Sequence, residues 1–176
     1  NECSLRCSYC YARSGEFSPL RMDQGTAEAV IRRACADARS AGMDRFSLAF
    51  HGGGEPTLHW ELLESSVRLA RSLPLPCGIS MTSNAMWSAR QRDFILANLD
   101  EVSVSFDGTE RVQNLQRPRP DGGPSFGRAL ENIQALDGSA LAYGVRMTAT
   151  DESFDELAEG VALLCERTAC PVIQVE

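Results

Sequence analysis

Residues 3–10 read CSLRCSYC, so Cys3, Cys7 and Cys10 follow one another with the spacing C-x3-C-x2-C, and Tyr9 precedes the last of them. Three thiolates this close together can bind a metal ion or a cluster, but they are one ligand short of a closed four-coordinate site. A cluster held by three protein ligands keeps one iron open. The missing fourth cysteine therefore makes this segment a candidate for chemistry as well as for structure.

Other interpretations of the cysteines stay open from their spacing alone. Positions 3, 7 and 10 would share one face of a helix, where they could be buried apolar thiols. They could also form three quarters of a zinc site that a distant His or Cys completes. A disulfide framework fits the chain less well, because seven cysteines cannot all be paired with one another.

The composition indicates a globular protein and excludes several classes of partner. The 176 residues are enough for one domain with a sizeable core. A net charge of −7 argues against a nonspecific nucleic-acid surface, which needs a basic patch. No run approaches the roughly 18 apolar residues of a membrane span, and no signal segment opens the chain. We therefore expect a reducing, cytoplasmic location, with no nucleic-acid and no membrane partner.

Strand-like and helix-like stretches alternate along the chain. Short alternating apolar runs predict strands, and longer amphipathic runs predict helices. We expect strands at 45–50, 78–82, 102–106, 141–150 and 171–175. We expect helices at 26–41, 60–73, 88–99, 125–136 and 154–168. The polar segment 107–124, rich in Gly, Pro and Arg, is predicted to be the longest loop.

This alternation predicts an α/β fold in which βα units form a parallel sheet. We expect a partial (β/α)6 barrel of the TIM type, formed by residues 1–176 as one domain. The cysteine segment precedes the first predicted strand, whereas a βα series should open with a strand that delivers its first loop. We therefore expect the first strand of the barrel to lie before Asn1, in a longer protein.

A second unusual segment, HGGGEPT at residues 51–57, follows the strand predicted at 45–50. Ligand sites of parallel α/β folds gather at this end of the strands. Consecutive glycines let a ligand approach the backbone, and Glu55 places a carboxylate beside it. The loop lacks the Lys and Ser/Thr of a phosphate-binding loop, so it suits an ammonium group better. Taken alone, it is also compatible with a simple turn before a helix.

Together, the segments 3–10 and 52–56 (GGGEP) resemble the radical SAM superfamily, where SAM is S-adenosylmethionine. Further matches follow in order along the chain: Thr82-Ser83-Asn84, Ser103–Gly108 (SVSFDG), Arg117, Gly122-Gly123 and Ser125-Phe126. The last stretch looks like the SPASM-type branch, which includes anaerobic sulfatase-maturating enzymes and peptide-modifying maturases. Two positions depart from that pattern, since Gln113-Asn114 stands where His-Asp is frequent and Ala85 where Gly is common.

The resemblance covers essentially the whole chain and implies that residues 1–176 are a radical SAM core domain without an auxiliary-cluster domain. It implies a [4Fe–4S] cluster on Cys3, Cys7 and Cys10, with SAM bound to the fourth iron through its amino and carboxylate groups. One electron, from a donor such as ferredoxin or flavodoxin, would cleave SAM to a 5′-deoxyadenosyl radical that removes hydrogen from substrate. The branch implies a peptide or protein substrate, such as a precursor peptide or a sulfatase.

The resemblance also implies residues that contact SAM. Glu55, with the backbone of Gly53 and Gly54, would hold the methionyl ammonium group. Tyr9 resembles an aromatic residue near the adenine, although ordinary packing would also explain it. Ser105 could donate a hydrogen bond to the ribose or to the methionyl part.

Four further residues carry less specific expectations. Arg117 is a candidate partner of the SAM carboxylate, because a guanidinium matches a carboxylate in a bidentate manner. Arg146 competes for that role if it points into the barrel, and is otherwise a solvent-exposed strand residue. Val175 could pack on the adenine or belong to the core. Asp107 could bind substrate or cap a turn.

Two other functions remain compatible with the sequence. The first is a radical SAM enzyme that acts on a small molecule or activates a glycyl-radical enzyme. The second is a noncatalytic zinc-binding module. We identify no Ser–His–Asp set and no paired acid and base, and we assign no catalytic side chain beyond the cofactor contacts.

Overall fold

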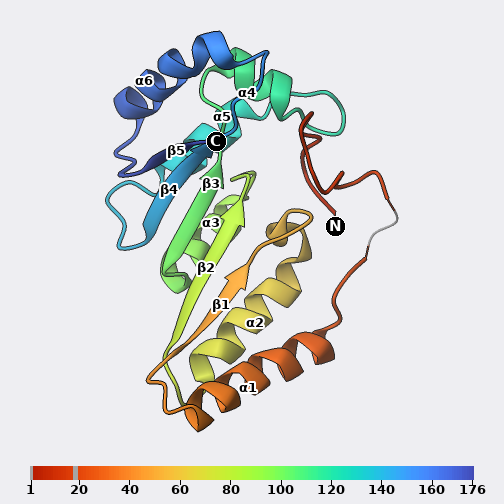
Figure 1. The fold of residues 1–176 in the computed structure, drawn as a ribbon, viewed down its shortest axis with the longest axis vertical. Helices are drawn as coiled ribbons and strands as arrows, with labels where there is room; N and C mark the ends of the chain where they lie inside the picture. The colour runs from red at the N-terminus through yellow and green to blue at the C-terminus, as the bar shows by residue number, and fades with distance from the viewer. Residues whose placement is uncertain (1, 18–19) are drawn as a thin grey trace.

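The computed structural model describes residues 2–17 and 20–176. Five parallel strands form one sheet in the order β1-β2-β3-β4-β5, so each strand lies beside the next one in sequence (Figure 1). The strands are Phe46–Phe50 (β1), Cys77–Ser83 (β2), Glu101–Ser105 (β3), Ala142–Met147 (β4) and Ile173–Val175 (β5). The helices are Gln24–Ser40 (α1), Trp60–Ser72 (α2), Ala89–Asn98 (α3), Glu110–Gln116 (α4), Phe126–Gln134 (α5) and Leu157–Arg167 (α6).

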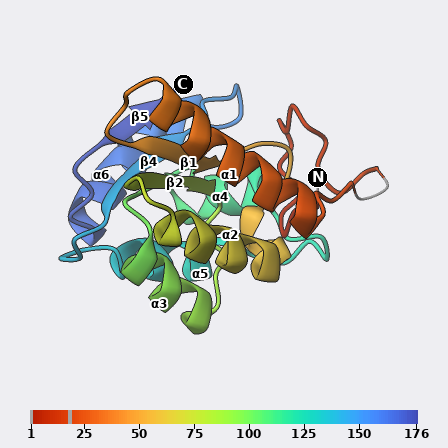
Figure 2. The same cartoon turned by 90° about the horizontal axis from the view of Figure 1, so that it is seen from below.

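Sequential strand order with helical crossovers is the architecture of a βα barrel wall. Figure 2 shows α2, α3 and α5 along one face of the sheet. The α/β fold with a partial TIM-like barrel, predicted from the alternation of elements, is confirmed.

The two faces of the sheet differ in chemistry. On each strand, alternate residues pack with the helices in one apolar cluster: Phe46, Ile79, Met81, Val102, Val104, Val145 and Met147. The residues between them lie on the opposite face and are small or polar: Ser47, Ala49, Ser80, Thr82, Ser103, Ser105, Gly144 and Arg146. The strand register places Ser105 beside Arg146. Side chains alternate between faces, so these polar residues share the open side of the barrel wall.

The segment 107–124 is not the continuous loop that its composition predicts, because it contains helix α4. Thr109 caps this helix by accepting a hydrogen bond from the Val112 backbone. The buried face of α4 carries the amides of Gln113 and Gln116, which are 0% and 1% exposed. A helix that buries glutamines shows no apolar periodicity, which is why the pattern concealed it.

Two further boundaries differ from expectation. The strand predicted to reach residue 150 ends at Met147, because the next backbone N–H, of Thr148, donates to the Asp107 carboxylate. The helix predicted from residue 154 starts as a 3-10 turn, Phe154–Glu156, before α6 begins.

Gly108, directly after β3, allows α6 to pack against the turn that leads into α4. Its φ is +96°, and a Cβ there would lie 2.7 Å from the Cα of Gly160 and 2.9 Å from Cε of Met147. We predict that Gly108→Ala lowers the free energy of unfolding by about 1–2 kcal/mol for the left-handed backbone and a further ~1–3 kcal/mol for overpacking. Urea denaturation measures the change.

Gly138→Ala is the matched control for this prediction. Gly138 also has a positive φ, +72°, but nothing lies within 4 Å of an added Cβ. Only the backbone term, about 1–2 kcal/mol, should then be lost. Equal losses at the two positions would show that the contact between Gly108 and Gly160 does not constrain the packing of α6.

Candidate functional site

The loops at the carboxyl ends of the strands surround a cavity of about 360 Å³. Its walls include the three clustered cysteines and most of the other residues singled out in the sequence: Cys3, Cys7, Cys10, Tyr9, Gly54, Glu55, Ser105, Arg117 and Arg146. The volume lies within the ~300–1,000 Å³ range of small-molecule sites. A somewhat larger cavity, about 400 Å³, lies between α1, β1 and α2 and contains no cysteine. The smaller cavity is therefore the candidate functional site, because the cysteines line it.

The cysteine segment is an irregular loop and not a helix, so the interpretation of its thiols as one buried helix face is wrong. A turn joins the Cys10 N–H to the Cys7 carbonyl at 3.2 Å. Three backbone hydrogen bonds attach the loop to the rest of the chain: Glu55 N–H to the Glu2 carbonyl (2.7 Å), Arg6 N–H to the Pro118 carbonyl (2.7 Å) and Ser8 N–H to the Gln116 carbonyl (2.9 Å). The loop therefore has a defined position without regular secondary structure.

Glu55 is buried and is held by four hydrogen bonds from two neighbouring loops. Its Oε1 accepts from Thr57 N–H (3.2 Å), Thr57 Oγ1 (2.8 Å) and Ser83 Oγ (2.8 Å). Within residues 2–17 and 20–176, Oε2 accepts from Asn84 N–H alone (2.9 Å). Burial raises the pKa of Glu55, although these hydrogen bonds act in the opposite direction. The carboxylate thus joins the loops after β1 and β2, and Oε2 retains acceptor capacity.

Asn84 lies close to one of the cysteines. Its Nδ2 is 3.6 Å from Cys3 Sγ and 3.1 Å from Ser4 Oγ. Asn84 belongs to a segment that matches the superfamily pattern, but the pattern gave the residue itself no role. Its distance from Cys3 in the sequence, 81 positions, explains why spacing alone could not reveal the contact.

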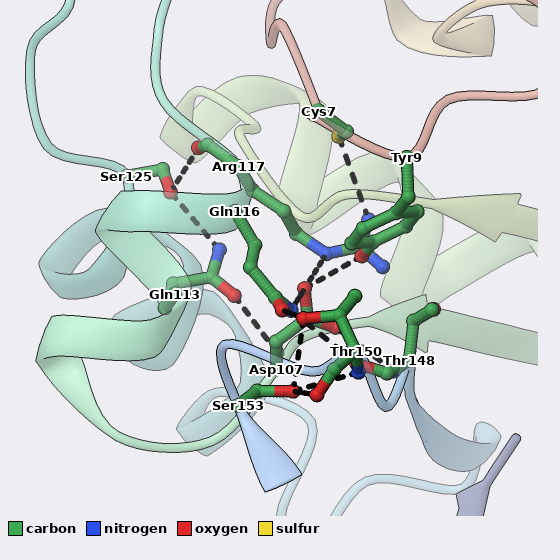
Figure 3. A network of polar contacts seen from close by, with 10 residues as sticks. All are labelled: Cys7, Tyr9, Asp107, Gln113, Gln116, Arg117, Ser125, Thr148, Thr150 and Ser153. Carbon is green, nitrogen blue, oxygen red and sulfur yellow. Dashed lines mark hydrogen bonds and ion pairs between the residues drawn. The ribbon is translucent and has the colours of Figure 1, made fainter.

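Asp107 is the centre of a buried polar network (Figure 3). Its Oδ2 accepts from Tyr9 Oη at 2.6 Å, from Gln116 Nε2 at 2.9 Å and from Arg117 Nε at 2.9 Å. Its Oδ1 accepts from Thr148 N–H at 3.1 Å. The sequence offered only a substrate contact or a turn cap for Asp107, and neither expectation included this network.

Arg117 lies between Asp107 and the cysteine loop. Its Cζ is 5.2 Å from the centre of the Tyr9 ring, and its Nη1 is 3.9 Å from Cys7 Sγ. Burial alone would lower the pKa of Arg117, but the charges of Asp107, Tyr9 and Cys7 raise it above its ordinary value. The guanidinium expected to pair with the SAM carboxylate is therefore already paired with a protein carboxylate.

The three cysteines differ in their surroundings. Burial raises the pKa of the Cys7 thiol to about 11, with the charge of Arg117 acting in the opposite direction. Burial likewise raises the pKa of Cys3. At Cys10, burial is outweighed by hydrogen bonds from Ser14 and neighbouring backbone groups, which hold its pKa below the usual value.

Arg146 lies on the open face of the sheet, lines the cavity and has a side chain that is 36% exposed. One end of its guanidinium forms an ion pair with Glu176. Its Nε is buried and has no hydrogen-bond partner among the residues that the structure describes. A buried donor without a partner is costly, which makes this atom a candidate ligand contact.

The remaining expected contacts are placed differently. Ser105 lines the cavity beside Arg146. Val175 pairs with Met147 in the row that faces the helices, is 46% exposed and does not belong to the cavity wall. Gly53 borders the larger cavity between α1, β1 and α2.

Gln113 and Asn114, which stand where the branch often has His-Asp, have structural partners. Gln113 accepts from Asp107 N–H and donates to Ser125 Oγ, at 2.8 and 2.9 Å. Asn114 Oδ1 accepts from the N–H groups of Ser125 and Phe126, both at 2.9 Å, at the start of α5. These amides connect α4 to α5 and do not face the cavity.

A sequence profile described as the Radical SAM superfamily matches residues 1–164. The chain belongs to the radical SAM superfamily. This confirms the resemblance inferred from the cysteine and Gly-Gly-Glu-Pro segments. Among the described residues, no helix is both long and apolar enough to cross a bilayer.

Three relatives illustrate the breadth of the match. A GTP 3′,8-cyclase of Chlorobaculum tepidum is 31% identical over 134 residues, covering 76% of this chain and 38% of that protein. A serine-type anaerobic sulfatase-maturating enzyme of Klebsiella aerogenes is 26% identical over 161 residues, covering 85% of this chain and 38% of that protein. The solved structure of native anSMEcpe with bound AdoMet and Kp18Cys peptide has a TM-score of 0.85 at 22% identity, covering 98% and 47% of the two chains. This last likeness shows the fold. The chain spans less than half the length of each of the three proteins.

The superfamily implies a [4Fe–4S] cluster and SAM, and the residues of the cavity fit both. Three cysteines line one wall, and polar side chains lie near two of their sulfurs, as cluster sites require. The unpartnered Arg146 Nε supplies a donor for an anionic group. Within residues 2–17 and 20–176, no three His, Cys, Asp or Glu side chains gather to hold a single metal ion. Cysteines that each bind a different iron of one cluster need not converge on a single point.

We predict that Glu55→Gln lowers the free energy of unfolding by about 1–3 kcal/mol, because its amide group would direct a donor at groups that now donate to the carboxylate. Urea denaturation of the metal-free protein measures the effect. Glu166→Gln, on an exposed position of α6, should change stability by less than about 0.5 kcal/mol. Equal effects would contradict the role of Glu55 in joining the loops after β1 and β2.

Proposed function

We propose that this chain is the core of an enzyme that reductively cleaves SAM at a [4Fe–4S] cluster and uses the product to modify a peptide or protein side chain. The observation that carries the proposal is the convergence of three cysteines, the Gly-Glu loop and an unpartnered arginine nitrogen on one cavity. Cys3, Cys7 and Cys10 would hold the cluster. When bound, the cluster supplies the electron that breaks the C–S bond of SAM, and the resulting 5′-deoxyadenosyl radical removes hydrogen from substrate.

The residues around the cavity divide the recognition of SAM among them. Glu55 Oε2, which accepts one hydrogen bond within the described residues, and the Gly54 backbone would accept hydrogen bonds from the methionyl amino group. Arg146 Nε is the donor available for the methionyl carboxylate, and this supports Arg146 over Arg117 for that role. Ser105, beside Arg146, would contact the ribose or methionyl part. Tyr9 bounds the same cavity and remains our candidate neighbour of the adenine.

A peptide or protein substrate is supported by the maturase relative and by the fold of the peptide-bound structure. The electron would come from a ferredoxin or a flavodoxin. A second candidate substrate class is a small molecule, which is favoured by the identity to the GTP 3′,8-cyclase. Incubation of the loaded, reduced protein with candidate peptides or with GTP, followed by mass spectrometry, separates the two. Formation of deoxyadenosine that depends on the peptide supports the first, and dependence on GTP supports the second.

Anaerobic reconstitution tests the proposed chemistry. We predict about four irons and four sulfides per chain, as a [4Fe–4S] cluster requires, and loss of both in Cys7→Ala without loss of the fold. The fold survives because the buried apolar cluster does not include the three cysteines. Cys35→Ala, which alters a buried thiol of α1, is the control and should keep the cluster. A colourless protein with one zinc would establish the zinc-module alternative instead.

We predict that Arg146→Gln weakens SAM binding to the reconstituted protein about ten-fold or more, because a charge-assisted hydrogen bond contributes roughly 1.5–3 kcal/mol. Isothermal titration calorimetry under anaerobic conditions measures the affinity. Arg128→Gln, at an exposed position of α5, is the control with the same change in charge. An unchanged affinity in Arg146→Gln would exclude Arg146 from the carboxylate site.

A further inference from the structure

The loop that carries Cys7 and the short segment 116–118 that carries Arg117 run side by side in opposite directions. Arg6 N–H donates to the Pro118 carbonyl at 2.7 Å, and Ser8 N–H donates to the Gln116 carbonyl at 2.9 Å. These two bonds bracket Cys7 on one side and Arg117 on the other, in the manner of a short antiparallel pairing. Residues directly opposite each other in such a pairing have neighbouring side chains. The contact between Cys7 and Arg117 is therefore set by the backbone.

The guanidinium has little freedom to leave this position. Its side chain is 8% exposed, and that of its partner Asp107 is 1% exposed. Arg117 Nε donates to Asp107 Oδ2 at 2.9 Å, and the Tyr9 ring lies against the guanidinium, 5.2 Å from Cζ. Breaking a buried ion pair of this kind leaves an uncompensated charge, which is strongly unfavourable.

Asp107 is in turn fixed from three parts of the chain. Tyr9 holds it from the cysteine loop, Gln116 from α4 and the Thr148 N–H from the end of β4. Figure 3 shows the guanidinium of Arg117 between Asp107 and Cys7. The Nη1 atom lies 3.9 Å from Cys7 Sγ, so a positive charge is held next to one of the three cysteine sulfurs.

We propose that the Asp107–Arg117 pair sets the reduction potential of the iron–sulfur cluster by holding a guanidinium against the sulfur of Cys7, an inference that rests on the cluster assignment above. Reduction adds one electron, taken from the external donor, and no bond to the pair forms or breaks. Hydrogen bonds and charges near cysteine sulfurs control such potentials. The positive charge of Arg117 favours the reduced cluster, and the negative charge of Asp107 opposes it. Both residues act on the cluster indirectly, through the sulfur of Cys7.

The opposite charges predict shifts of opposite sign. Arg117→Gln removes the positive charge and should lower the midpoint potential. Asp107→Asn removes the negative charge but keeps an oxygen that can accept from Arg117 Nε, so the guanidinium stays beside Cys7 and the potential should rise. The midpoint potential of the double variant should return toward the wild-type value, because it loses one positive and one negative charge whose effects on the cluster oppose each other. A merely structural role would instead disturb the loop in both single variants and move the potential in the same direction.

The test is an EPR-monitored redox titration of the anaerobically reconstituted protein, with iron and sulfide measured for every variant. Arg119→Gln and Asp121→Asn are the matched controls, since these residues form an exposed ion pair in the same segment, 48% and 62% exposed. Their potentials should equal that of the wild type. Unchanged potentials in Arg117→Gln and Asp107→Asn, or shifts of the same sign, would overturn the inference. A wild-type protein without a cluster would overturn the proposed function itself.

Arg117→Lys keeps the test decisive if a neutral variant fails to bind the cluster. Lysine retains the charge but lacks the fork that Asp107 and the Tyr9 ring hold in place. We expect Arg117→Lys to load the cluster with a midpoint potential below that of the wild type. An unchanged potential would contradict the part of the inference that assigns the effect to the fixed position of the guanidinium at Cys7.

Discussion

The buried carboxylate of Asp107 joins three parts of the chain that lie far apart in sequence: the cysteine loop, helix α4 and the end of β4. Burying the Asp107 carboxylate without these hydrogen-bond donors would cost several kcal/mol. The donors, which are themselves mostly buried, need the carboxylate as their acceptor in the same way. The consequence reaches the functional site directly. Tyr9 and Arg117, which flank Cys7 in space, are both held by Asp107. One side chain just after β3 thus helps to hold an irregular loop in position, together with the backbone hydrogen bonds of that loop.

Glu55 performs the corresponding task on the other side of the cavity. It joins the loops after β1 and β2, and its backbone N–H holds the start of the cysteine segment through the Glu2 carbonyl. Two buried residues therefore hold the loop at both ends, Glu55 through its backbone N–H and Asp107 through its carboxylate, while the open face of the sheet supplies small and polar neighbours. A satisfied buried network is rigid, and a rigid wall is what a site needs to hold a reactive molecule away from water.

Much of this arrangement could be predicted from the sequence, because it depends on local patterns. The strands followed from short apolar runs, the parallel sheet from their alternation with helices, and the candidate site from the cysteine and Gly-Glu segments. The remainder depends on contacts that no local pattern contains. Helix α4 was hidden because its buried face carries Gln113 and Gln116, and the network of Asp107 joins residues up to 98 positions apart. The proposed choice between Arg117 and Arg146 required knowledge of which guanidinium nitrogens have partners, since both groups form an ion pair but, among the described residues, Arg146 Nε is left without one.

The most direct test of a SAM site on these three cysteines is electron–nuclear double resonance of the reduced, reconstituted protein with SAM labelled at its amino nitrogen and carboxylate carbon. Binding to the iron that the protein leaves open predicts hyperfine coupling of the cluster to both labels. Loss of the nitrogen coupling in Glu55→Gln and of the carbon coupling in Arg146→Gln would agree with the roles assigned here. A cluster on Cys3, Cys7 and Cys10 that shows no coupling to either label in the wild type would contradict the account.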